Sequence, residues 1–459
     1  MLLSALVEIL QDWLPAFPQS RSGRRAIQQA LGTLVALGRR TLSRALWALG
    51  KQHLDWSADY KLHGRTTWKA DALFQPIVNR ALPLCAGPYV VIAMDDTNIR
   101  KTGRQILTAF YQRDPLSPKF RFNLMWGLRF LHLTLLVPLY RAHADAAPRS
   151  LPIRFLEVPA LKRPGKKASA AQRAAFREAA KQNNLSTHSL SALTSVRAAV
   201  DQAGQPERWI LAVGDGSFCN RTLFRPVLDR VQLLARTRKD IRLCRRAPET
   251  GRAFYDTRKF TPEQIRQDAS IPWLAASVFH GGQWRSVRYK SVAEVYWETG
   301  ARRRRLRLLV VAPTPYESGK GKRKYYRDPA FLLTTDCRGP AESLLQGYFD
   351  RWQIEVNHRE EKDTLGVGQA QLRNPRAVPR QPALVVAAYS ALLLAGLQVY
   401  GPHRTSDFPA LPKWRRKATR PSCLDLITVL RNELTAQKAL PSLPSIDLDW
   451  KTLGLAASA

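Results

Sequence analysis

The stretch Tyr89–Thr97, YVVIAMDDT, decides how the middle of the chain is expected to fold. It opens with a continuous apolar run, which is typical of a strand covered on both faces of a sheet. The run ends at Asp95 and Asp96. A second run of the same kind, Trp209–Val213, is followed by Gly-Asp-Gly with Asp215 at its centre. The sequence therefore predicts two buried strands that each end in an acidic residue.

Strands and helices are expected to alternate around these runs, and such alternation predicts an α/β fold. Bulky apolar residues predict two strands, RFNLMWGL and FLHLTLLVPLY, between Lys119 and Tyr140, and another strand at Val231–Ala235. Helices are predicted over Ala170–Ala199 and Arg225–Arg230. Before residue 85, leucines at helical spacing alternate with arginines, which predicts helices with one basic face. A plain solvated helix face is the alternative interpretation.

Residues 244 to 338 differ from this pattern, because strand-like pieces alternate there with turns rich in Gly, Pro and Lys. They predict a β-rich insertion whose surface is strongly basic, owing to Arg302–Arg305 and the loop GKGKRK at 319–324. A basic connection, PKWRRK at 412–417, precedes a predicted terminal helix near 424–439. The expected divisions of the chain are a helical domain (1–84), two parts of an α/β core (85–243 and 339–400), the insertion (244–338) and a basic helical region (401–459).

The charge of the chain narrows the choice of partner. The 459 residues include 72 Lys and Arg against 36 Asp and Glu, which gives a formal charge of +36. With 12 Trp, 16 Phe and 13 Tyr the chain is too rich in large side chains to be a disordered basic tail. A folded protein with this charge is expected to bind a polyanion, and nucleic acid is the first candidate. The 5 Cys form no C-x-x-C pair, which argues against a zinc finger or a disulfide scaffold.

No membrane association is expected from the sequence. The N-terminal MLLSALVEIL lacks a basic first region and carries Glu8, so we interpret it as an amphipathic helix rather than a signal peptide. The longest apolar stretch, Ala383–Val399, is borderline in length for a membrane span. We interpret it as a buried core helix and expect a soluble, cytoplasmic protein.

A long helix is predicted from Pro340 to Leu365, because Pro suits the first helical turn and glycines follow the end. At 3.6 residues per turn, four of its polar residues would lie on one stripe roughly 60° wide. Relative to Tyr348 at zero, Arg351 falls at roughly −60°, Glu355 at roughly −20° and Lys362 at roughly −40°. Such a stripe suits a track of phosphate contacts beside a metal ligand. The alternative interpretation of the stripe is a surface row of ion pairs. The alternative interpretation of the aspartates after the two apolar runs is an ordinary turn or helix cap.

Four residues of this helix match the pattern Y-x2-R-x3-E-x6-K in every position: Tyr348, Arg351, Glu355 and Lys362. In this pattern the chain resembles the DDE cut-and-paste transposases of bacterial insertion sequences. The tryptophan after the arginine and the isoleucine before the glutamate are also similar to that family. Asp95-Asp96-Thr97 resembles the first acidic motif of the family, and Val213–Gly216 resembles the second. The resemblance covers roughly residues 85 to 400.

The resemblance implies an RNase H-like fold, in which a mixed sheet flanked by helices is interrupted by the β-rich insertion. Residues 85–243 and 339–400 are then expected to form the catalytic core, and residues 1–84 a DNA-binding domain. It also implies that acidic residues converge and hold two divalent ions, Mg²⁺ or Mn²⁺. Carboxylate oxygens suit these ions, and two ions about 3.5–4 Å apart clamp the attacking and leaving oxygens of a phosphoryl transfer. The implied catalytic residues and metal ligands are Asp95 or Asp96, Asp215 and Glu355.

Contacts with DNA are implied for other residues of the motif. The resemblance assigns phosphate contacts to Tyr348, Arg351 and Lys362, with no covalent intermediate through Tyr348. It assigns the handling of an extruded base to Trp352, for which stacking is a reasonable mode. A core tryptophan is the equal alternative. Trp284 and Trp297 are weaker candidates for the same task.

The first ligand stays open between Asp95 and Asp96. Neighbours on a regular strand point to opposite faces, so at most one of them is expected to enter the site. Asp95 directly follows the apolar run, whereas Asp96 precedes Thr97 in a pair that resembles the family motif. His358 has no spaced partner, and we interpret it as a structural or solvent-facing histidine.

The expected function is that of a DNA transposase, which cleaves the ends of an element and joins them to target DNA. Double-stranded DNA and a second copy of the chain in a homodimer are the implied partners. No phosphate loop of the Walker type is present, so no nucleotide cofactor is expected. The alternatives are an RNase H-like nuclease that cuts without joining, and a basic nucleic-acid-binding protein without catalysis.

Overall fold

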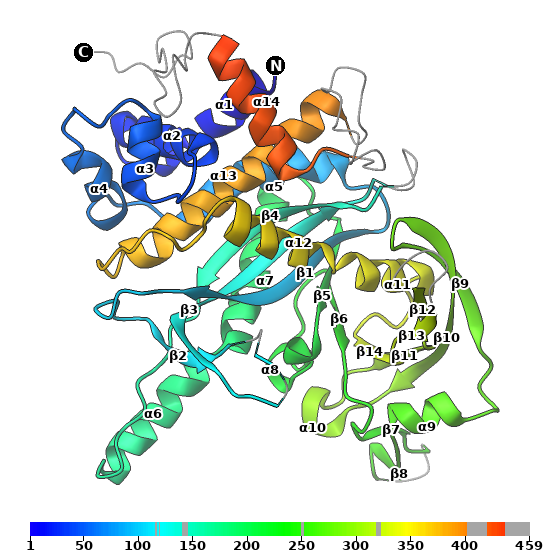
Figure 1. The fold of residues 1–459 in the computed structure, drawn as a ribbon. Helices are drawn as coiled ribbons and strands as arrows, with labels where there is room; N and C mark the ends of the chain where they lie inside the picture. The colour runs from blue at the N-terminus through cyan, green and yellow to red at the C-terminus, as the bar shows by residue number, and fades with distance from the viewer. Residues whose placement is uncertain are drawn as a thin grey trace. The chain divides into compact units, whose positions relative to one another are not determined.

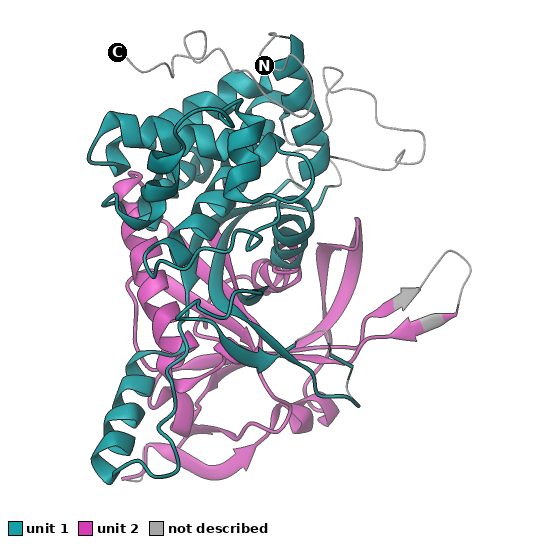
Figure 2. Ribbon diagram, turned by 60° about the vertical axis from the view of Figure 1, so that its left-hand side comes forward, with its two compact units in different colours: residues 1–84, 96–184, 354–459 teal, residues 85–95, 185–353 magenta. Residues whose placement is uncertain are grey.

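The structure is a computed structural model that describes residues 1–114, 117–118, 120–139, 146–248, 252–317, 323–401 and 420–436. It divides into two compact units, coloured separately in Figure 2. Unit 1 comprises residues 1–84, 96–184 and 354–459, and unit 2 comprises residues 85–95 and 185–353. The predicted basic segment 412–417 and residues 319–322 of the predicted basic loop lie outside the described residues.

Unit 1 begins with the all-helical region that the leucine spacing predicted (Figure 1). Each of the longer helices buries its apolar face; in α2, for example, Ile27, Leu31 and Leu34 are fully buried. The helices are α1 (Leu2–Gln11), α2 (Ser20–Val35), α3 (Leu42–Ala48), α4 (Ser57–Gly64) and α5 (Gln75–Ala81). The prediction of a helical N-terminal region is therefore confirmed.

The apolar stretch Ala383–Val399 lies within helix α13 (Ala377–Tyr400), which packs against α1, α2 and strand β4 (Arg149–Glu157) of the same unit. Its most apolar window has a mean hydropathy of 1.8 and is 89% buried inside the protein. Such burial is typical of the core helix of a soluble protein. The interpretation of this stretch as a buried helix is confirmed. The predicted terminal helix corresponds to α14 (Cys423–Ala436).

The strands of unit 1 differ from the prediction in two places. Strand β3 (Leu124–Val137) is one strand where two were predicted, since no turn sequence interrupts its run of bulky residues. It lies between β2 (Phe110–Arg113) and the second half of β1 (Tyr89–Arg100) in the order β2-β3-β1. Strand β4 pairs only with β3 and was not predicted; its Pro152 is tolerated because β4 is an edge strand.

The helix predicted over 170–199 is in fact two helices, α6 (Ala170–Gln182) in unit 1 and α7 (Leu185–Gln202) in unit 2. Ser169 begins α6 with a capping box, and Asn183 ends it in a non-helical conformation. The Asn184 amide then donates to the carbonyls of Ala180 and Lys181. Asparagine competes with the helix for backbone groups, which explains the break.

Unit 2 contains a mixed sheet in the order β1-β5-β6-β14-β11-β10-β9. The first half of β1, β5 and β6 are parallel, and the remaining neighbours are antiparallel. The prediction of a mixed sheet with flanking helices is confirmed. The strands predicted for the insertion continue this sheet. The bounds are β5 (Trp209–Gly214), β6 (Val231–Arg236), β9 (Leu274–His280), β10 (Gln283–Val295), β11 (Leu306–Val311) and β14 (Ala330–Thr334).

Smaller elements complete unit 2. The helix predicted over 225–230 is wrong, because α8 ends at Phe224 and Pro226 disfavours a helical residue before it. The remaining bounds are α8 (Arg221–Phe224), α9 (Pro262–Gln267), α10 (Glu298–Ala301), β7 (Leu243–Arg246), β8 (Tyr255–Phe260), β12 (Pro315–Glu317) and β13 (Lys324–Tyr326).

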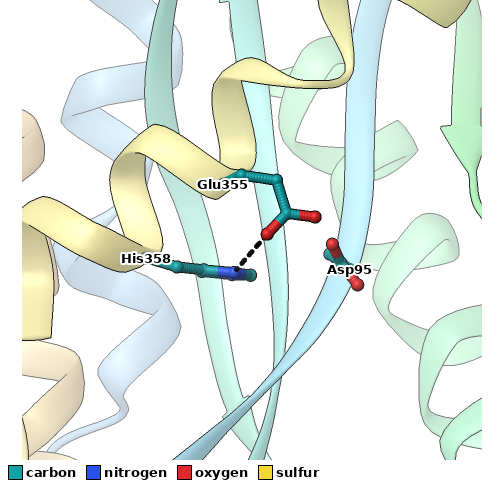
Figure 3. Close-up of side chains that lie close together, drawn as sticks. All are labelled: Asp95, Glu355 and His358. Atoms are coloured by element: carbon teal, nitrogen blue, oxygen red, sulfur yellow. Dashed lines mark ion pairs between the residues drawn. The ribbon is translucent and has the colours of Figure 1, made fainter. Parts of the chain in front are cut away.

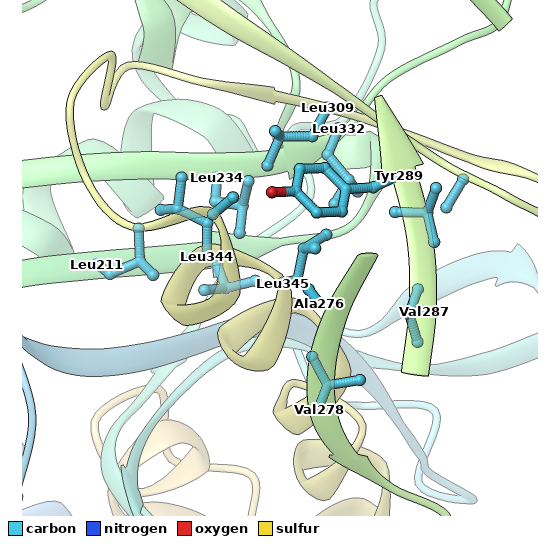
Figure 4. Packing of buried hydrophobic residues seen from close by; sticks show 14 of the residues in the cluster. Leu211, Leu234, Ala276, Val278, Val287, Tyr289, Leu309, Leu332, Leu344 and Leu345 are labelled. Atoms are coloured by element: carbon cyan, nitrogen blue, oxygen red, sulfur yellow. The ribbon is translucent and has the colours of Figure 1, made fainter. Parts of the chain in front are cut away.

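The core of unit 2 lies between this sheet and helix α11 (Ala341–Asp350). Leu344 and Leu345 of α11 are fully buried in one apolar cluster with residues of several strands, Leu211 and Leu309 among them (Figure 4). Gly347 lets the helix approach the sheet, since a Cβ there would lie 3.1 Å from Leu211 Cδ2. This packing fixes the end of α11, which carries Tyr348.

The single helix predicted from 340 to 365 is wrong. Helix α11 ends at Asp350, and α12 (Gln353–Arg359) follows after a two-residue turn. A π-helix then spans Glu360–Thr364. A π-helix has wider hydrogen-bond spacing than an α-helix. An angle calculated at 3.6 residues per turn is therefore wrong for Lys362, which lies in the π-helix. The angles expected for one continuous helix therefore do not apply to the four residues of the predicted stripe.

Candidate metal and nucleic-acid site

Two aspartates of unit 2, Asp95 and Asp215, occupy equivalent positions on neighbouring parallel strands. The prediction that both strands end at their acidic residues is wrong for β1, which continues through Asp95 and Asp96 to Arg100. The register of β1 and β5 runs to the pair Ala93 and Val213. Asp95 and Asp215 each lie two residues beyond that pair. Because side chains alternate along a strand, residues two further on return to the same face. The alignment therefore gives both carboxylates access to the same end and side of the sheet.

Each of these carboxylates has a partner within unit 2. Arg351, directly after α11, places its Nη1 3.3 Å from Asp95 Oδ2, and the two side chains are only 16% and 14% exposed. Asp215 is the N-cap of a short 3-10 helix, and its Oδ1 accepts a hydrogen bond from the Ser217 backbone N–H at 2.8 Å. Asp95 thus already faces a cationic group, as expected for an anionic side chain with little exposure.

Asp96, the neighbour of Asp95, has a different partner. Its Oδ2 lies 2.7 Å from Nε of Arg129, which belongs to β3 in the same unit. Asp95 and Asp96 therefore use different arginines, consistent with side chains that alternate between the faces of β1. This arrangement favours Asp95 as the aspartate with a carboxylate for the candidate site.

Glu355 and His358 lie one turn apart on α12, with 3.9 Å between Glu355 Oε2 and His358 Nδ1. Figure 3 shows these two side chains, with a dashed line between them. They give unit 1 a carboxylate and an imidazole as a pair of candidate metal donors, whereas Asp95 and Asp215 belong to unit 2.

The chemistry of these donors fits a divalent cation. Carboxylate oxygens suit Mg²⁺ and Mn²⁺, and an imidazole nitrogen adds a ligand that transition metals accept more readily than Mg²⁺ does. The Arg351 guanidinium competes with a cation for Asp95, so metal binding would require this ion pair to loosen. Asp215, at the equivalent position of the next strand, is the residue best placed to extend the donor set.

Buried polar residues of unit 1 support the segment that carries Glu355. The His358 ring lies 5.1 Å from the ring of His132 on β3, and His132 Nε2 lies 3.4 Å from Glu361 Oε1. Burial lowers the pKa of His132 well below its ordinary value of 6.5 and raises the pKa of Glu361 well above its ordinary value of 4.5, so burial favours the neutral form of both side chains. Lys362, half-buried in the π-helix, acts on both groups electrostatically.

Tyr348, Arg351 and Trp352 line a pocket of about 570 Å³ in unit 2. The Trp352 side chain is 58% exposed, which argues against the alternative of a core tryptophan. Burial and the nearby Arg327 and Arg285 lower the pKa of His280 in this pocket to about 4, so the imidazole is neutral at pH 7. The remaining lining includes Arg236, Arg327, Asp328, Tyr326 and Phe349. Guanidinium groups beside exposed aromatic rings suit a nucleotide, with phosphate on the arginines.

The two weaker tryptophan candidates are placed elsewhere in unit 2. Trp297 packs edge-on against Phe224, with 6.1 Å between ring centroids, and has a structural role. Trp284 is 41% exposed on β10 and contacts Phe279. Neither lines the pocket of Trp352.

Sequence reasoning missed His358, Arg236 and Arg327. His358 lies three residues after Glu355, and that spacing places two side chains on one helical face. The spacing was the available signal, but the burial of the ring beside His132 depends on tertiary structure. Arg236 and Arg327 had no signal beyond their charge. The chain matches no protein-family model and no curated protein sequence.

Proposed function

We propose that this chain is a DNA transposase of the DDE type with an RNase H-like catalytic core. It would cut DNA at the ends of an element and join the ends to target DNA, in a reaction that depends on Mg²⁺ or Mn²⁺. The observation that carries the proposal is the equivalent placement of Asp95 and Asp215 on the neighbouring parallel strands β1 and β5 of unit 2. The sequence pattern around Glu355 supports it.

Asp95 and Glu355 would hold a divalent ion, and Asp215 would contribute to binding of a second. When bound, such ions supply Lewis-acid activation of water or a 3′-hydroxyl and stabilise the leaving oxygen. His358 would fix the orientation of the Glu355 carboxylate or join it as a ligand. We assign Asp95 rather than Asp96 as the first ligand, because the strand register aligns Asp95 with Asp215, whereas Asp96 alternates to the other face and lies 2.7 Å from Arg129.

Arg351, Tyr348 and Trp352 would bind DNA in the pocket that they line. Arg351 supplies a planar guanidinium for phosphate, and Trp352 offers an exposed ring for a base. The charge of +36 would add affinity through release of counterions, so binding would weaken steeply with salt. Lys362 would contribute charge from the π-helix. A homodimer would bring two DNA ends together.

One observation favours a second candidate, a basic DNA-binding protein without catalysis. Arg351 lies 3.3 Å from Asp95, so this acid has a cationic partner even without metal. In that case the acids would only stabilise the fold. An RNase H-like nuclease that cuts without joining uses the same groups, and only its products distinguish it from a transposase.

The test is nicking of supercoiled plasmid by the full-length protein with Mg²⁺ or Mn²⁺. Wild type should nick DNA only when the metal is present, and Glu355→Gln should abolish nicking while DNA binding persists. Glu207→Gln, at a side chain that is 82% exposed, is the matched control. Nicking that persists in Glu355→Gln would overturn the ligand assignment. Joining of a pre-cut 3′ end to plasmid would separate a transposase from a nuclease.

A further inference from the structure

Strands β2 and β3 form a hairpin in unit 1 (Figure 1). Large apolar side chains are exposed on this hairpin and on the loop before it. Isolated exposed hydrophobic residues are ordinary, but a group of them on one element marks an interaction site. Their exposed fractions are 79% for Leu107, 54% for Tyr111, 92% for Phe120, 66% for Phe122 and 56% for Leu124. None of them serves the candidate metal site.

The register of the hairpin gathers part of this group on one face. Tyr111 pairs with Trp126, and Arg113 pairs with Leu124. Directly paired residues, and residues two apart on one strand, share a face of a sheet. These four residues, with Arg104 and Phe122, are called here the aromatic–arginine face.

The rings of this face are held in place by arginines. The Arg104 guanidinium carbon lies 5.5 Å from the centre of the Tyr111 ring and 5.7 Å from that of Trp126. Its Nη1 also donates to the Tyr111 hydroxyl. Arg113 lies 5.8 Å from the centre of the Phe122 ring. Cation–π contacts of this kind orient both partners and leave part of each ring for another π-system.

Tyr111 and Trp126 also contact each other, with 5.1 Å between ring centroids and 59° between ring planes. Trp126 Nε1–H donates to the Gly103 carbonyl at 3.1 Å, which fixes the indole. The face is therefore ordered before any ligand binds, and a ligand that stacks on it would meet rings already in position.

The charge around the face selects the class of ligand. Between Arg100 and Leu128 the described residues include four arginines and one acid, Asp114. Asp114 lies 3.0 Å from Arg100, which already neutralises it. A second copy of this face would bring arginines against arginines, so self-association is disfavoured. An anionic partner with flat aromatic groups fits both the rings and the charge.

We propose that the aromatic–arginine face binds unpaired nucleotides of DNA, with bases stacked on Tyr111 and Phe122 and phosphates on the arginines. Stacking on exposed aromatic rings beside cationic groups is the mode by which proteins bind single strands without sequence preference. Paired bases in a duplex are already stacked and present their flat faces only at ends. The face therefore distinguishes single-stranded or frayed DNA from intact duplex. It needs none of the acidic residues of the metal site.

The experiment measures binding of a single-stranded oligonucleotide that contains 2-aminopurine, with EDTA present so that no cleavage occurs. The full-length protein is compared with Tyr111→Ala and Phe122→Ala, whose side chains are exposed and contribute little to the core. Each substitution should weaken single-strand binding at least about fivefold, since one lost stack has roughly that effect. Binding of an intact, capped duplex should change by less than about twofold.

Two further variants make the result specific. Phe122→Tyr keeps a ring and should restore binding, whereas Phe122→Leu keeps the bulk and should not. Tyr325→Ala is the matched control, because Tyr325 is 45% exposed with the Arg323 guanidinium 5.9 Å from its ring centre, in a different part of the chain. Equal losses for single strand and duplex, or rescue by Phe122→Leu, would overturn the proposal. Because metal is absent, that failure is distinct from failure of the proposed cleavage activity.

Discussion

Two glutamates six residues apart, Glu355 on α12 and Glu361 in the π-helix, have opposite surroundings. The Glu355 side chain is 40% exposed and lies beside His358 in the pair of candidate metal donors on α12. The Glu361 side chain is 2% exposed, and burial raises its pKa. A carboxylate must be charged to hold a cation, whereas a buried carboxyl is more stable when neutral. Burial, rather than residue type, therefore separates a candidate ligand from a structural acid.

A third glutamate of this segment shows how the structural acids stabilise it. Glu360 Oε2 accepts a hydrogen bond of 2.5 Å from the Tyr389 hydroxyl on α13, and the Asn357 amide donates to the same hydroxyl at 2.8 Å. Glu361 Oε1 lies 3.4 Å from Nε2 of the buried His132 on β3. The π-helix thus attaches its two acids to buried partners in unit 1 while Glu355 stays accessible. Single-turn π-helices are often found beside functional sites, and this one supports the helix of a candidate ligand.

The largest expected effect comes from neutralising each glutamate in turn. Glu355→Gln should lower metal-dependent nicking by more than about 100-fold, which exceeds the loss typical of an outer-shell partner. Glu361→Gln should change it by less than about threefold, because glutamine replaces a buried carboxyl whose neutral form is favoured by burial. Initial rates of plasmid nicking at several Mn²⁺ concentrations measure both. Similar losses in the two variants would show that burial does not divide their roles.

The same contrast applies to the neighbouring aspartates of β1. Asp95→Asn should lose at least about 100-fold in nicking, as expected for a lost metal ligand, while Asp96→Asn should lose only a few-fold through its effect on β1. Thermal unfolding with and without Mn²⁺ gives an independent readout. Wild type and Asp96→Asn should be stabilised by the metal, and Asp95→Asn should not. The reverse pattern would assign the ligand role to Asp96.

The sequence predicted the features that depend on local pattern. The runs YVVIAM and WILAV became β1 and β5 because continuous apolar strands are buried on both faces, and the leucine spacing before residue 85 gave helices. Strand β4 was not predicted, because Pro152 weakens a strand pattern, although an edge strand tolerates proline. The break after Asp350 and the π-helix at Glu360 change no apolar period, so residue spacing could not reveal them. For the same reason the burial of His358 and Glu361 required the structure.

A smaller effect should appear in the pH dependence of stability. Because the pKa of Glu361 is raised above its ordinary value of 4.5 in the folded protein, its stabilising contribution is complete below that value. The contribution is lost as pH rises toward the folded-state pKa, by at most about 1.4 kcal/mol per pH unit. Glu361→Gln lacks this titration. Between about pH 5 and pH 8, the range in which wild type loses the contribution, the unfolding free energy of Glu361→Gln should therefore fall less than that of wild type.

Urea unfolding of both proteins across this range measures the difference. The buried His132 has a lowered pKa, so its own contribution has the opposite sign and is lost as pH falls below 6.5. Wild type and Glu361→Gln both retain His132, and the comparison cancels its contribution to first order. A difference that stays constant with pH would mean that Glu361 ionises normally, and the contrast with Glu355 would then disappear.

The smallest expected effect concerns the ion pair between Asp96 and Arg129. The Asp96 carboxylate lies 2.7 Å from Arg129, with the side chains 19% and 35% exposed. Partly exposed pairs of this kind contribute about 0.5–1 kcal/mol, and the contribution falls when salt screens the charges. A double-mutant cycle of Asp96→Asn and Arg129→Gln, followed by urea unfolding, should give this coupling at low salt and less at about 1 M salt. If the coupling is zero, Asp96 is not engaged by Arg129 in solution, and the argument that leaves Asp95 as the metal ligand loses its support.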